Sequence, residues 1–134
     1  MKIAFQMDPI GDVNINADSS FRLAEEAQAR GHSLFFYTPD HLAYQEGRIT
    51  ARGHDMTVQR VAGNPAILGE MREVDLSEFD VVWLRQDPPF DMEYIYTTYL
   101  LERAEADGAF VVNKPQSLRD CNEKLFATTF PQCC

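Results

Sequence analysis

The chain has 134 residues, of which 45% are hydrophobic and 25% are charged, and its formal net charge is -9. These values fit one globular domain and exclude a wholly disordered chain. An acidic surface repels nucleic-acid phosphates and anionic membranes, so neither is an expected partner. No apolar run reaches the roughly 20 residues of a membrane helix. The N-terminus becomes acidic too early for a signal peptide, so we expect a cytoplasmic protein.

The first part of the chain predicts a strand, a helix and a second strand. Residues 2–7 form a short apolar run closed by Asp-Pro, which is typical of a buried strand. Residues 18–20 offer an N-cap for a helix over 21–30, and Gly31 suits its left-handed C-terminal stop. Residues 33–37 are again apolar. This succession has the size of a βαβ unit.

The middle and the second half of the chain carry further segments. Residues 44–53 place glycines at turn-like spacing among β-formers, which predicts a hairpin of short strands. Residues 70–80 are acidic, and we expect them to be solvated. Residues 81–85 and 109–112 are apolar and predict two more buried strands.

Between these last two strands the sequence predicts an amphipathic helix. Asp91 is placed to cap it and Gly108 to end it. Its apolar residues form a stripe at helical spacing, which consists of Met92, Ile95, Tyr96, Tyr99 and Leu100. Alternating apolar strands and amphipathic helices favour an α/β fold with a mostly parallel sheet.

The first candidate site is the loop after the first strand. In an open parallel sheet, ligands bind at the carboxyl ends of the strands. Here the loop carries Asn14 and Asn16 and leads to Ser19 and Ser20 at a helix start. Free N–H groups and a partial positive charge at a helix N-terminus suit a carboxylate or a phosphate. Plain capping without a ligand is the alternative.

The second candidate is Arg85, at the end of the predicted buried strand over 81–85. Its planar guanidinium is suited to clamping a carboxylate through two hydrogen bonds. The alternative is an ion pair within the protein, with Asp8 or Asp87 as the partner. The two prolines at 88 and 89 restrict the backbone that follows the arginine.

The third candidate is the run over residues 113–124, which holds two of the three lysines in the chain. Pro115 suits the first turn of a helix, and Ser117 or Asn122 could cap a later one. Lys114 and Lys124 are point charges of the kind used against phosphates. Solvated surface lysines are the alternative.

Other chemistries lack a motif. The sequence contains no GxGxxG, no GxxxxGK[ST] and no GxSxG, and its carboxylates form no metal-type cluster. Cys121 stands alone and Cys133 adjoins Cys134, so no CxxC site is present and we expect reduced thiols without a role. The histidines, which we interpret as structural or surface residues, are His32, His41 and His54.

Three motifs resemble, in chain order, the N-terminal region of bacterial glutathione synthetase. The first is Met-Asp-Pro-Ile over 7–10, with Asn14 and Asp-Ser-Ser-Phe over 18–21. The second is Leu-Arg-Gln-Asp-Pro-Pro-Phe-Asp over 84–91, with Tyr94 and Ile95. The third is Asn-Lys-Pro-Gln-Ser-Leu-Arg-Asp-Cys-Asn-Glu-Lys-Leu-Phe over 113–126. The likeness runs from residue 2 to about residue 130.

The resemblance implies an ATP-grasp ligase. Members of that family join γ-glutamylcysteine to glycine through an acyl phosphate, use ATP and Mg²⁺, and assemble as homo-oligomers. It also implies a three-layer, Rossmann-like pre-ATP-grasp domain, with helices on both faces of a mostly parallel sheet and a short β-hairpin. Residues 1–121 would form this substrate domain, and residues 122–134 would begin the ATP-grasp region.

Carried over by position, the resemblance assigns roles to six residues. Asn14, Asn16, Ser19, Ser20 and Arg85 match the wall that faces the substrate, and Lys124 matches a lysine of the nucleotide site. We also expect Asp87 to orient Arg85 rather than to touch the substrate. The implied metal ligands and catalytic residues have no counterpart in these 134 residues.

The sequence therefore predicts the substrate-binding front domain of a synthetase, which would be inactive alone because the ATP-grasp core is not among these residues. Two alternatives remain at this stage. One is a non-catalytic α/β binding or interaction domain. The other is the front domain of a different ATP-grasp ligase.

Overall fold

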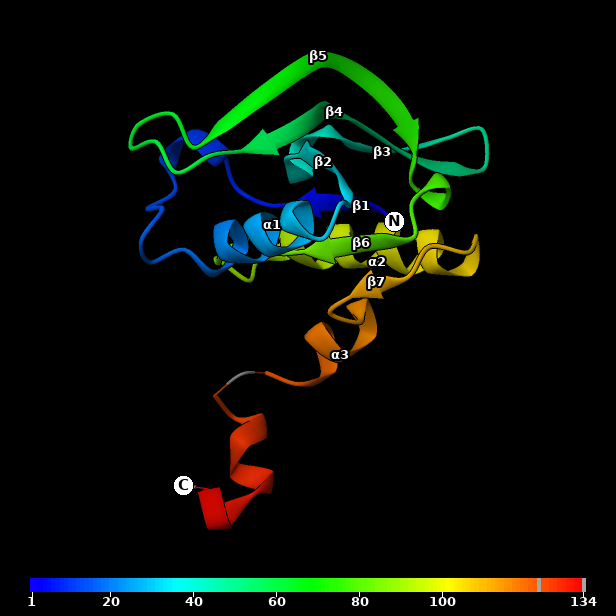
Figure 1. Cartoon of the computed structure of the whole chain (residues 1–134). Helices are drawn as coiled ribbons and strands as arrows, with labels where there is room; N and C mark the ends of the chain where they lie inside the picture. Colours follow the sequence, from blue (N-terminus) through cyan, green and yellow to red (C-terminus); the bar gives the residue numbers. More distant parts are fainter. Residues whose placement is uncertain (123, 134) are drawn as a thin grey trace.

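The fold is a seven-stranded sheet with helices on both sides, seen in a computed structural model that describes residues 1–122 and 124–133 (Figure 1). The strand order is β3-β4-β2-β1-β6-β7, and β5 pairs with β4. The strands are β1 (Lys2–Gln6), β2 (Ser33–Tyr37), β3 (Leu42–Gln45), β4 (Arg48–Val58), β5 (Ala66–Asp75), β6 (Val81–Leu84) and β7 (Val111–Val112). The α-helices are α1 (Ser19–Ala29), α2 (Met92–Ala106) and α3 (Pro115–Asp120).

The sheet is parallel in one half and antiparallel in the other. Strand β1 runs parallel to β2 and β6, and β6 runs parallel to β7. Strand β4 runs antiparallel to β2, β3 and β5. The expected α/β class is confirmed, but the expectation of a mostly parallel sheet is partly wrong. The tight turn at Glu46 and Gly47, both with positive φ, can join β3 and β4 only as antiparallel neighbours.

The predicted hairpin over 44–53 is confirmed as β3 and β4. The prediction that residues 70–80 are solvated is confirmed for residues 70–73, which are exposed, and is wrong for Val74, Leu76 and Phe79, which are buried. Strand β5, which includes residues 70–75, was not predicted. In the described part of the chain β5 pairs only with β4, so most of its side chains face solvent. Many of these side chains are charged, and the sequence of β5 therefore lacks the apolar run by which the other strands were predicted. A register shift opposite Asp55 bulges the ladder at Gly69 and Glu70.

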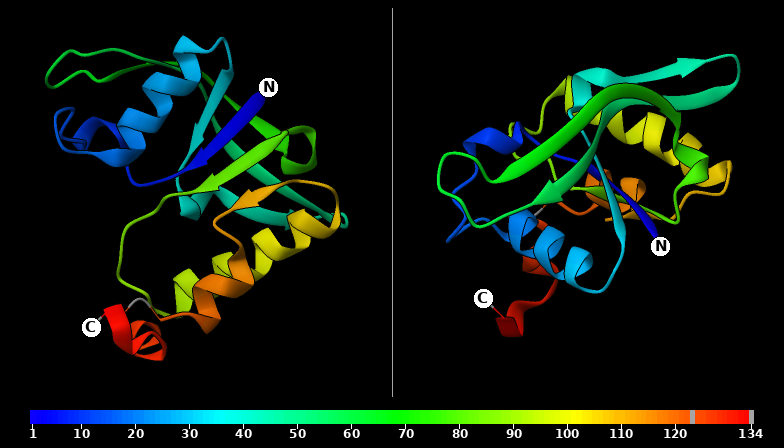
Figure 2. Two further views of the ribbon diagram at one scale, coloured as in Figure 1. Left: turned by 60° about the horizontal axis from the view of Figure 1, so that its bottom comes forward. Right: turned by 45° about the horizontal axis from the view of Figure 1, so that its top comes forward.

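Two apolar clusters, one on each face of the sheet, form the core. On one face, Phe21 and Ala24 of α1 pack with Phe5 of β1. On the other face, Leu101 of α2 packs with Phe35 of β2. Figure 2 shows the two helices on opposite sides of the strands. The expected three layers, with helices on both faces, are therefore confirmed.

The N-terminal caps of the two longer helices are confirmed. The Asp18 carboxylate accepts a hydrogen bond from the Phe21 N–H at 2.7 Å, and Asp91 accepts one from the Tyr94 N–H at 3.0 Å. Gly31 follows α1 with a φ of 78°. These are local side-chain and backbone requirements, which is why the sequence alone predicts them.

The predicted apolar stripe of α2 is partly wrong. Met92, Tyr96 and Tyr99 are 58%, 62% and 53% exposed. The buried residues of this helix are Thr97, Thr98, Leu101 and Ala104. The Thr98 hydroxyl donates a hydrogen bond to the Ile95 carbonyl at 2.6 Å, which satisfies this polar group inside the core. The outward side of α2 is consequently aromatic.

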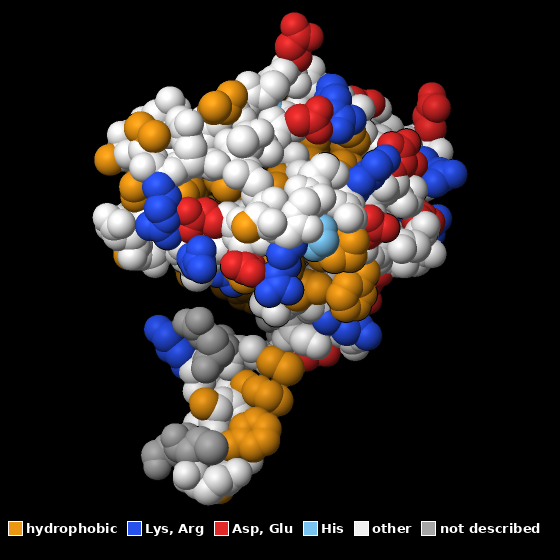
Figure 3. Space-filling model, in the orientation of Figure 1, with side chains coloured by type: hydrophobic (Ala, Val, Ile, Leu, Met, Phe, Trp, Pro, Cys, Tyr) orange, Lys and Arg blue, Asp and Glu red, His pale blue; other side chains and the backbone are white. Residues whose placement is uncertain are grey.

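The segment after α3 runs away from the sheet (Figure 1). Pro115 begins α3, as predicted. Asn122 Oδ1 accepts hydrogen bonds from the N–H groups of Lys124 and Leu125 and so folds a turn, but the short helix that follows has Leu125 rather than Asn122 at its N-cap. Hydrophobic side chains gather on this segment in Figure 3. The exposed ones are Leu125, Phe126 and Phe130.

Candidate functional site

A hollow of about 300 Å³ lies where β1 and β6 end and α1 begins. Parallel neighbours end at the same edge of a sheet, and the first turn of α1 closes the space between them. We call it the strand-end pocket. It is lined by Met7, Asp8, Pro9, Asp12, Val13, Asn14, Ala17, Asp18, Ser20, Arg85 and Asp87.

Arg85 is fixed in this pocket by hydroxyl groups. Its Nε donates to Ser20 Oγ at 3.0 Å and its Nη2 donates to Ser19 Oγ at 2.7 Å. Its backbone N–H donates to the Gln6 carbonyl at 2.7 Å. Arg85 forms no ion pair with any described carboxylate, so the expected alternative of an internal ion pair with Asp8 or Asp87 is wrong. The neutral hydroxyls orient the guanidinium but leave its charge available.

The two serines are available to Arg85 because Asp18 caps the helix in their place. The loop before them is folded by Asn14, whose Oδ1 accepts a hydrogen bond from the Asn16 N–H at 3.0 Å. The Asn14 carbonyl also accepts from the N–H groups of Ala17 and Asp18. Both asparagines are exposed, but only Asn14 lines the strand-end pocket, and Asn16 does not.

Carboxylates lie beside the guanidinium. The Asp87 N–H donates to Asp8 Oδ2 at 2.6 Å, which joins the loop after β6 to the loop after β1. The expected contact between Asp87 and Arg85 is absent in the described structure. Since Asp12 and Asp18 also line the pocket, a ligand there would meet both a positive group and negative groups.

Tyr94 of α2 is half-buried close to the same charges. Burial raises the pKa of its phenol; the Arg85 guanidinium opposes this effect, and the carboxylates of Asp87 and Asp8 add to it. The phenol therefore stays protonated at neutral pH.

A second hollow, of about 500 Å³, lies on the other face of the sheet, beside α2 and α3. We call it the α2-side pocket. It is lined by Gln86, Pro88, Phe90, Tyr94, Leu118, Arg119, Cys121, Asn122 and Lys124. Arg85 and Gln86 are consecutive but line different pockets, so the end of β6 serves both. Of the predicted residues, Lys124 belongs to this second pocket, and Lys114 lines neither.

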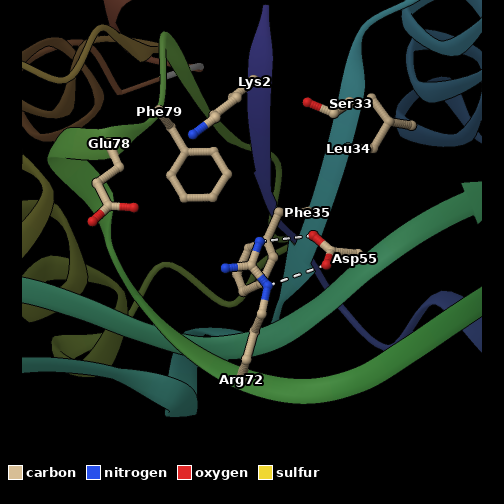
Figure 4. A pocket seen from close by; sticks show the side chains of 8 residues that line it. All are labelled: Lys2, Ser33, Leu34, Phe35, Asp55, Arg72, Glu78 and Phe79. Atoms are coloured by element: carbon tan, nitrogen blue, oxygen red, sulfur yellow. Dashed lines mark hydrogen bonds and ion pairs between the residues drawn. The ribbon is translucent and has the colours of Figure 1, made fainter.

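A third hollow, of about 90 Å³, lies at the amino ends of β1 and β2 (Figure 4). Arg72 makes two hydrogen bonds to the Asp55 carboxylate, at 3.1 and 2.8 Å, and its guanidinium lies over the Phe35 ring. Its charge is therefore neutralised within the fold. We interpret this hollow as structural, since ligands of such sheets bind at the opposite edge.

Some site residues were missed by the sequence analysis. Asp12 carries no local signal, and Tyr94 belongs to the second motif but was given no role at the site; the fold brings both beside the strand ends. Gln6 does carry one, since a polar residue closes an otherwise apolar strand. Among the described residues, no group of three or more His, Cys, Asp or Glu side chains could hold a metal ion. Cys121 is a free, half-buried thiol, and Cys134 lies outside the described residues.

Comparison with known proteins identifies the family of this domain. A family model described as the prokaryotic glutathione synthetase N-terminal domain matches residues 1–119. The chain belongs to this family. The matched range of the glutathione synthetase domain contains every residue of the strand-end pocket and stops before Lys124.

Curated relatives agree with this assignment. A glutathione synthetase of Pseudomonas putida is 51% identical over 136 residues, which cover 99% of this chain and 42% of the relative. One of Brucella melitensis is 52% identical, with 98% and 42% covered, and one of Mesorhizobium japonicum is 52% identical, with 97% and 41% covered. The chain thus spans about two fifths of the length of the relatives it matches.

Proposed function

We propose that this chain is the substrate-binding domain of a glutathione synthetase. The parent reaction would join γ-glutamylcysteine to glycine at the expense of ATP. The observation that carries the proposal is the Arg85 guanidinium, which is oriented by Ser19 and Ser20 and forms no ion pair with a carboxylate of the described residues. It lies within the range that matches the family.

The pocket suits the head group of γ-glutamylcysteine, which carries a carboxylate and an ammonium. Arg85 and the N-terminus of α1 would bind the carboxylate, as charge-assisted hydrogen bonds favour. The ammonium would lie towards Asp8 and Asp12. Ser19, Ser20 and Asn14 would hold this arrangement, and Asn16 would contribute from the exposed side of the loop.

Lys124 would contact ATP, because its exposed ammonium borders the α2-side pocket. Mg²⁺ would neutralise the nucleotide phosphates, but the described residues do not fit a magnesium site. We assign no metal ligand and no catalytic residue to this chain. A boundary after residue 121 is supported by the end of α3 at Asp120 and by the family match, which ends at residue 119.

We also propose a cytoplasmic location and assembly as a homo-oligomer when the domain is joined to an ATP-grasp core. The acidic composition supports the location. No described helix is long and apolar enough to cross a membrane. Light scattering on a chimera, in which residues 1–134 replace the matching segment of the Pseudomonas putida relative, would measure the assembly.

A chimera tests the function. Residues 1–134 would replace the matching segment of the Pseudomonas putida relative, with which they share 51% identity. We expect ADP release that requires both γ-glutamylcysteine and glycine, and no such release from the 134-residue chain alone. A folded chimera without this activity would contradict the proposal and favour an interaction domain. Activity with other amino-acid substrates would indicate a different ATP-grasp ligase.

A further inference from the structure

Gln6 is a fully buried amide in an apolar setting. It ends β1 with 0% exposure, and its neighbours in register are Tyr37 of β2 and Leu84 of β6. Its side chain lies on the face of the sheet that α2 covers, the same face to which Ala4 contributes its side chain. Burying an amide is unfavourable unless its donors and acceptors find partners.

The partners of Gln6 compensate this burial only in part. Its Nε2 donates to Gln86 Oε1, and its backbone carbonyl accepts from the Arg85 N–H. Its Oε1 is buried and has no hydrogen-bond partner in the described structure. A leucine of similar size would avoid that unpaired oxygen, so stability alone does not account for the glutamine.

What the Gln6 amide does achieve is to orient Gln86. Because Gln6 holds the side-chain oxygen of Gln86, the Nε2 group of Gln86 is left as the donor in the α2-side pocket. Asn122 is oriented in the same way, since backbone N–H groups occupy its Oδ1. With the Lys124 ammonium, these groups present donors to whatever enters the pocket.

We propose that Gln6 is a positioning residue that holds Gln86 as a hydrogen-bond donor towards an oxygen acceptor of a substrate in the α2-side pocket. The acceptor is a carboxylate or a phosphate oxygen, because all the oriented polar groups of the pocket donate. This inference rests on the proposed function, which supplies two candidate ligands: γ-glutamylcysteine carries the carboxylate, and ATP carries the phosphate.

The first experiment uses the 134-residue chain without ligand. In nitrogen-15 NMR spectra, the side-chain amide protons of Gln6 should exchange slowly with solvent, and Gln86→Leu should make them exchange faster. Gln6→Leu should keep or raise the midpoint of urea unfolding, because it removes an unpaired buried oxygen. Fast exchange in the parent chain would overturn the inference and leave the proposed function untouched.

The second experiment uses the active chimera. Gln6→Leu and Gln86→Leu should each raise the KM of one substrate about 3- to 10-fold, the contribution of one ordinary hydrogen bond. The kcat should stay within about twofold, and the double variant should be no worse than either single one, because both remove the same contact. A rise for γ-glutamylcysteine identifies the carboxylate, and a rise for ATP identifies the phosphate.

Tyr37→Phe is the matched control. It removes another buried oxygen that has no hydrogen-bond partner in the described structure, from the neighbouring strand, and leaves the hydrogen bond between Gln6 and Gln86 in place. It should leave every KM unchanged. If Gln6→Leu does not fold, Gln86→Glu replaces it, since a carboxylate still accepts from Gln6 but can no longer donate. A larger rise in KM is then expected, because the new negative charge also repels the anionic group of the substrate. An active chimera whose KM values do not respond to these changes would overturn the inference alone.

Discussion

At the scale of single residues, the strand-end pocket depends on how Arg85 is held. A guanidinium held by two hydroxyls keeps its full charge, whereas one paired with a carboxylate has little attraction left for a ligand. The serines reach it because α1 begins with Asp18 as its cap. One aspartate therefore decides both where the helix starts and which side chains face the arginine.

Arg85→Ala in the chimera should raise the KM for γ-glutamylcysteine. Losing the partner of a buried carboxylate costs about 2–4 kcal/mol, which corresponds to a rise of about 30- to 1000-fold. Arg22→Ala is the control, because Arg22 lies on the same helix but its guanidinium pairs with Glu25 and Glu26 outside the pocket. An unchanged KM in Arg85→Ala would reduce Arg85 to a structural role.

Gly53 of β4 shows a different kind of residue-scale constraint, which is close packing. A Cβ there would lie 2.1 Å from the Phe36 carbonyl oxygen and 2.9 Å from Tyr37 Cβ. We expect Gly53→Ala to lower the free energy of unfolding by about 2–3 kcal/mol in urea titrations. Gly69→Ala, whose Cβ would meet nothing closer than 3.6 Å, should change it by less than about 0.5 kcal/mol.

At the scale of elements, Arg119 fastens α3 to α2. Its guanidinium donates to Thr98 Oγ1 at 3.0 Å and to Glu102 Oε2 at 2.6 Å, and it lies over the Tyr99 ring at 4.3 Å. Helix α3 is thus tied to α2 through a buried threonine, a glutamate and one face of a half-exposed tyrosine. The Arg119 contact also fixes one wall of the α2-side pocket.

Arg119→Met should loosen α3 without unfolding the domain. Hydrogen bonds to charged groups contribute about 1.5–3 kcal/mol, so amide hydrogen exchange over residues 115–120 should become at least about tenfold faster. Arg103→Met is the control, because the exposed Arg103 forms its ion pair in the described structure with Asp107, the residue that follows α2, at 3.6 Å. Equal exchange in the two variants would show that α3 is held by other contacts.

Elements with local signals were the predictable ones. The strands β1, β2 and β6 follow from apolar runs, and the starts of α1 and α2 follow from their capping aspartates. Strand β5 and the orientation of α2 were not predictable in the same way. Which face of an element is buried depends on the partner that covers it. For this reason β5 carries charged residues although it is a strand, and α2 buries threonines although it also carries tyrosines.

The same distinction applies to the site. That Arg85 and the start of α1 lie close together could be predicted, because parallel strands end at one edge of the sheet. It could not be predicted that hydroxyls rather than carboxylates hold Arg85, since the choice of partner depends on distances within the pocket. The contact between Gln6 and Gln86 joins residues 80 positions apart and leaves no pattern in the sequence.

At the scale of the whole molecule, stability should depend on acid pH. Hydrogen bonding from Arg72 lowers the pKa of Asp55, hydrogen bonding from Ser77 lowers that of Asp75, and hydrogen bonding from Arg60 lowers that of Glu25. The unfolded chain therefore binds more protons than the folded one around pH 4. The stabilisation is complete above the unfolded pKa values and is lost as pH falls through the folded ones.

The urea midpoint should accordingly be constant from pH 7 to about pH 5 and should fall towards pH 3. Arg72→Met should make this fall shallower, because Asp55 would lose the partner that lowers its pKa. A midpoint that does not change between pH 5 and pH 3 would contradict these assignments.

The open side of β5 has a practical consequence for handling the protein. A strand edge without a partner can pair with extended chains of other molecules. In the described structure β5 has such an edge, and the exposed side chains of Ile67, Leu68 and Met71 add apolar contact area to it. The bulge and the charges of Glu70 and Glu73 oppose such pairing. Near the isoelectric point, about 4.7, charge repulsion between molecules disappears and the carboxylates start to protonate. Concentrated solutions should therefore stay clear well above that pH and turn cloudy as they approach it.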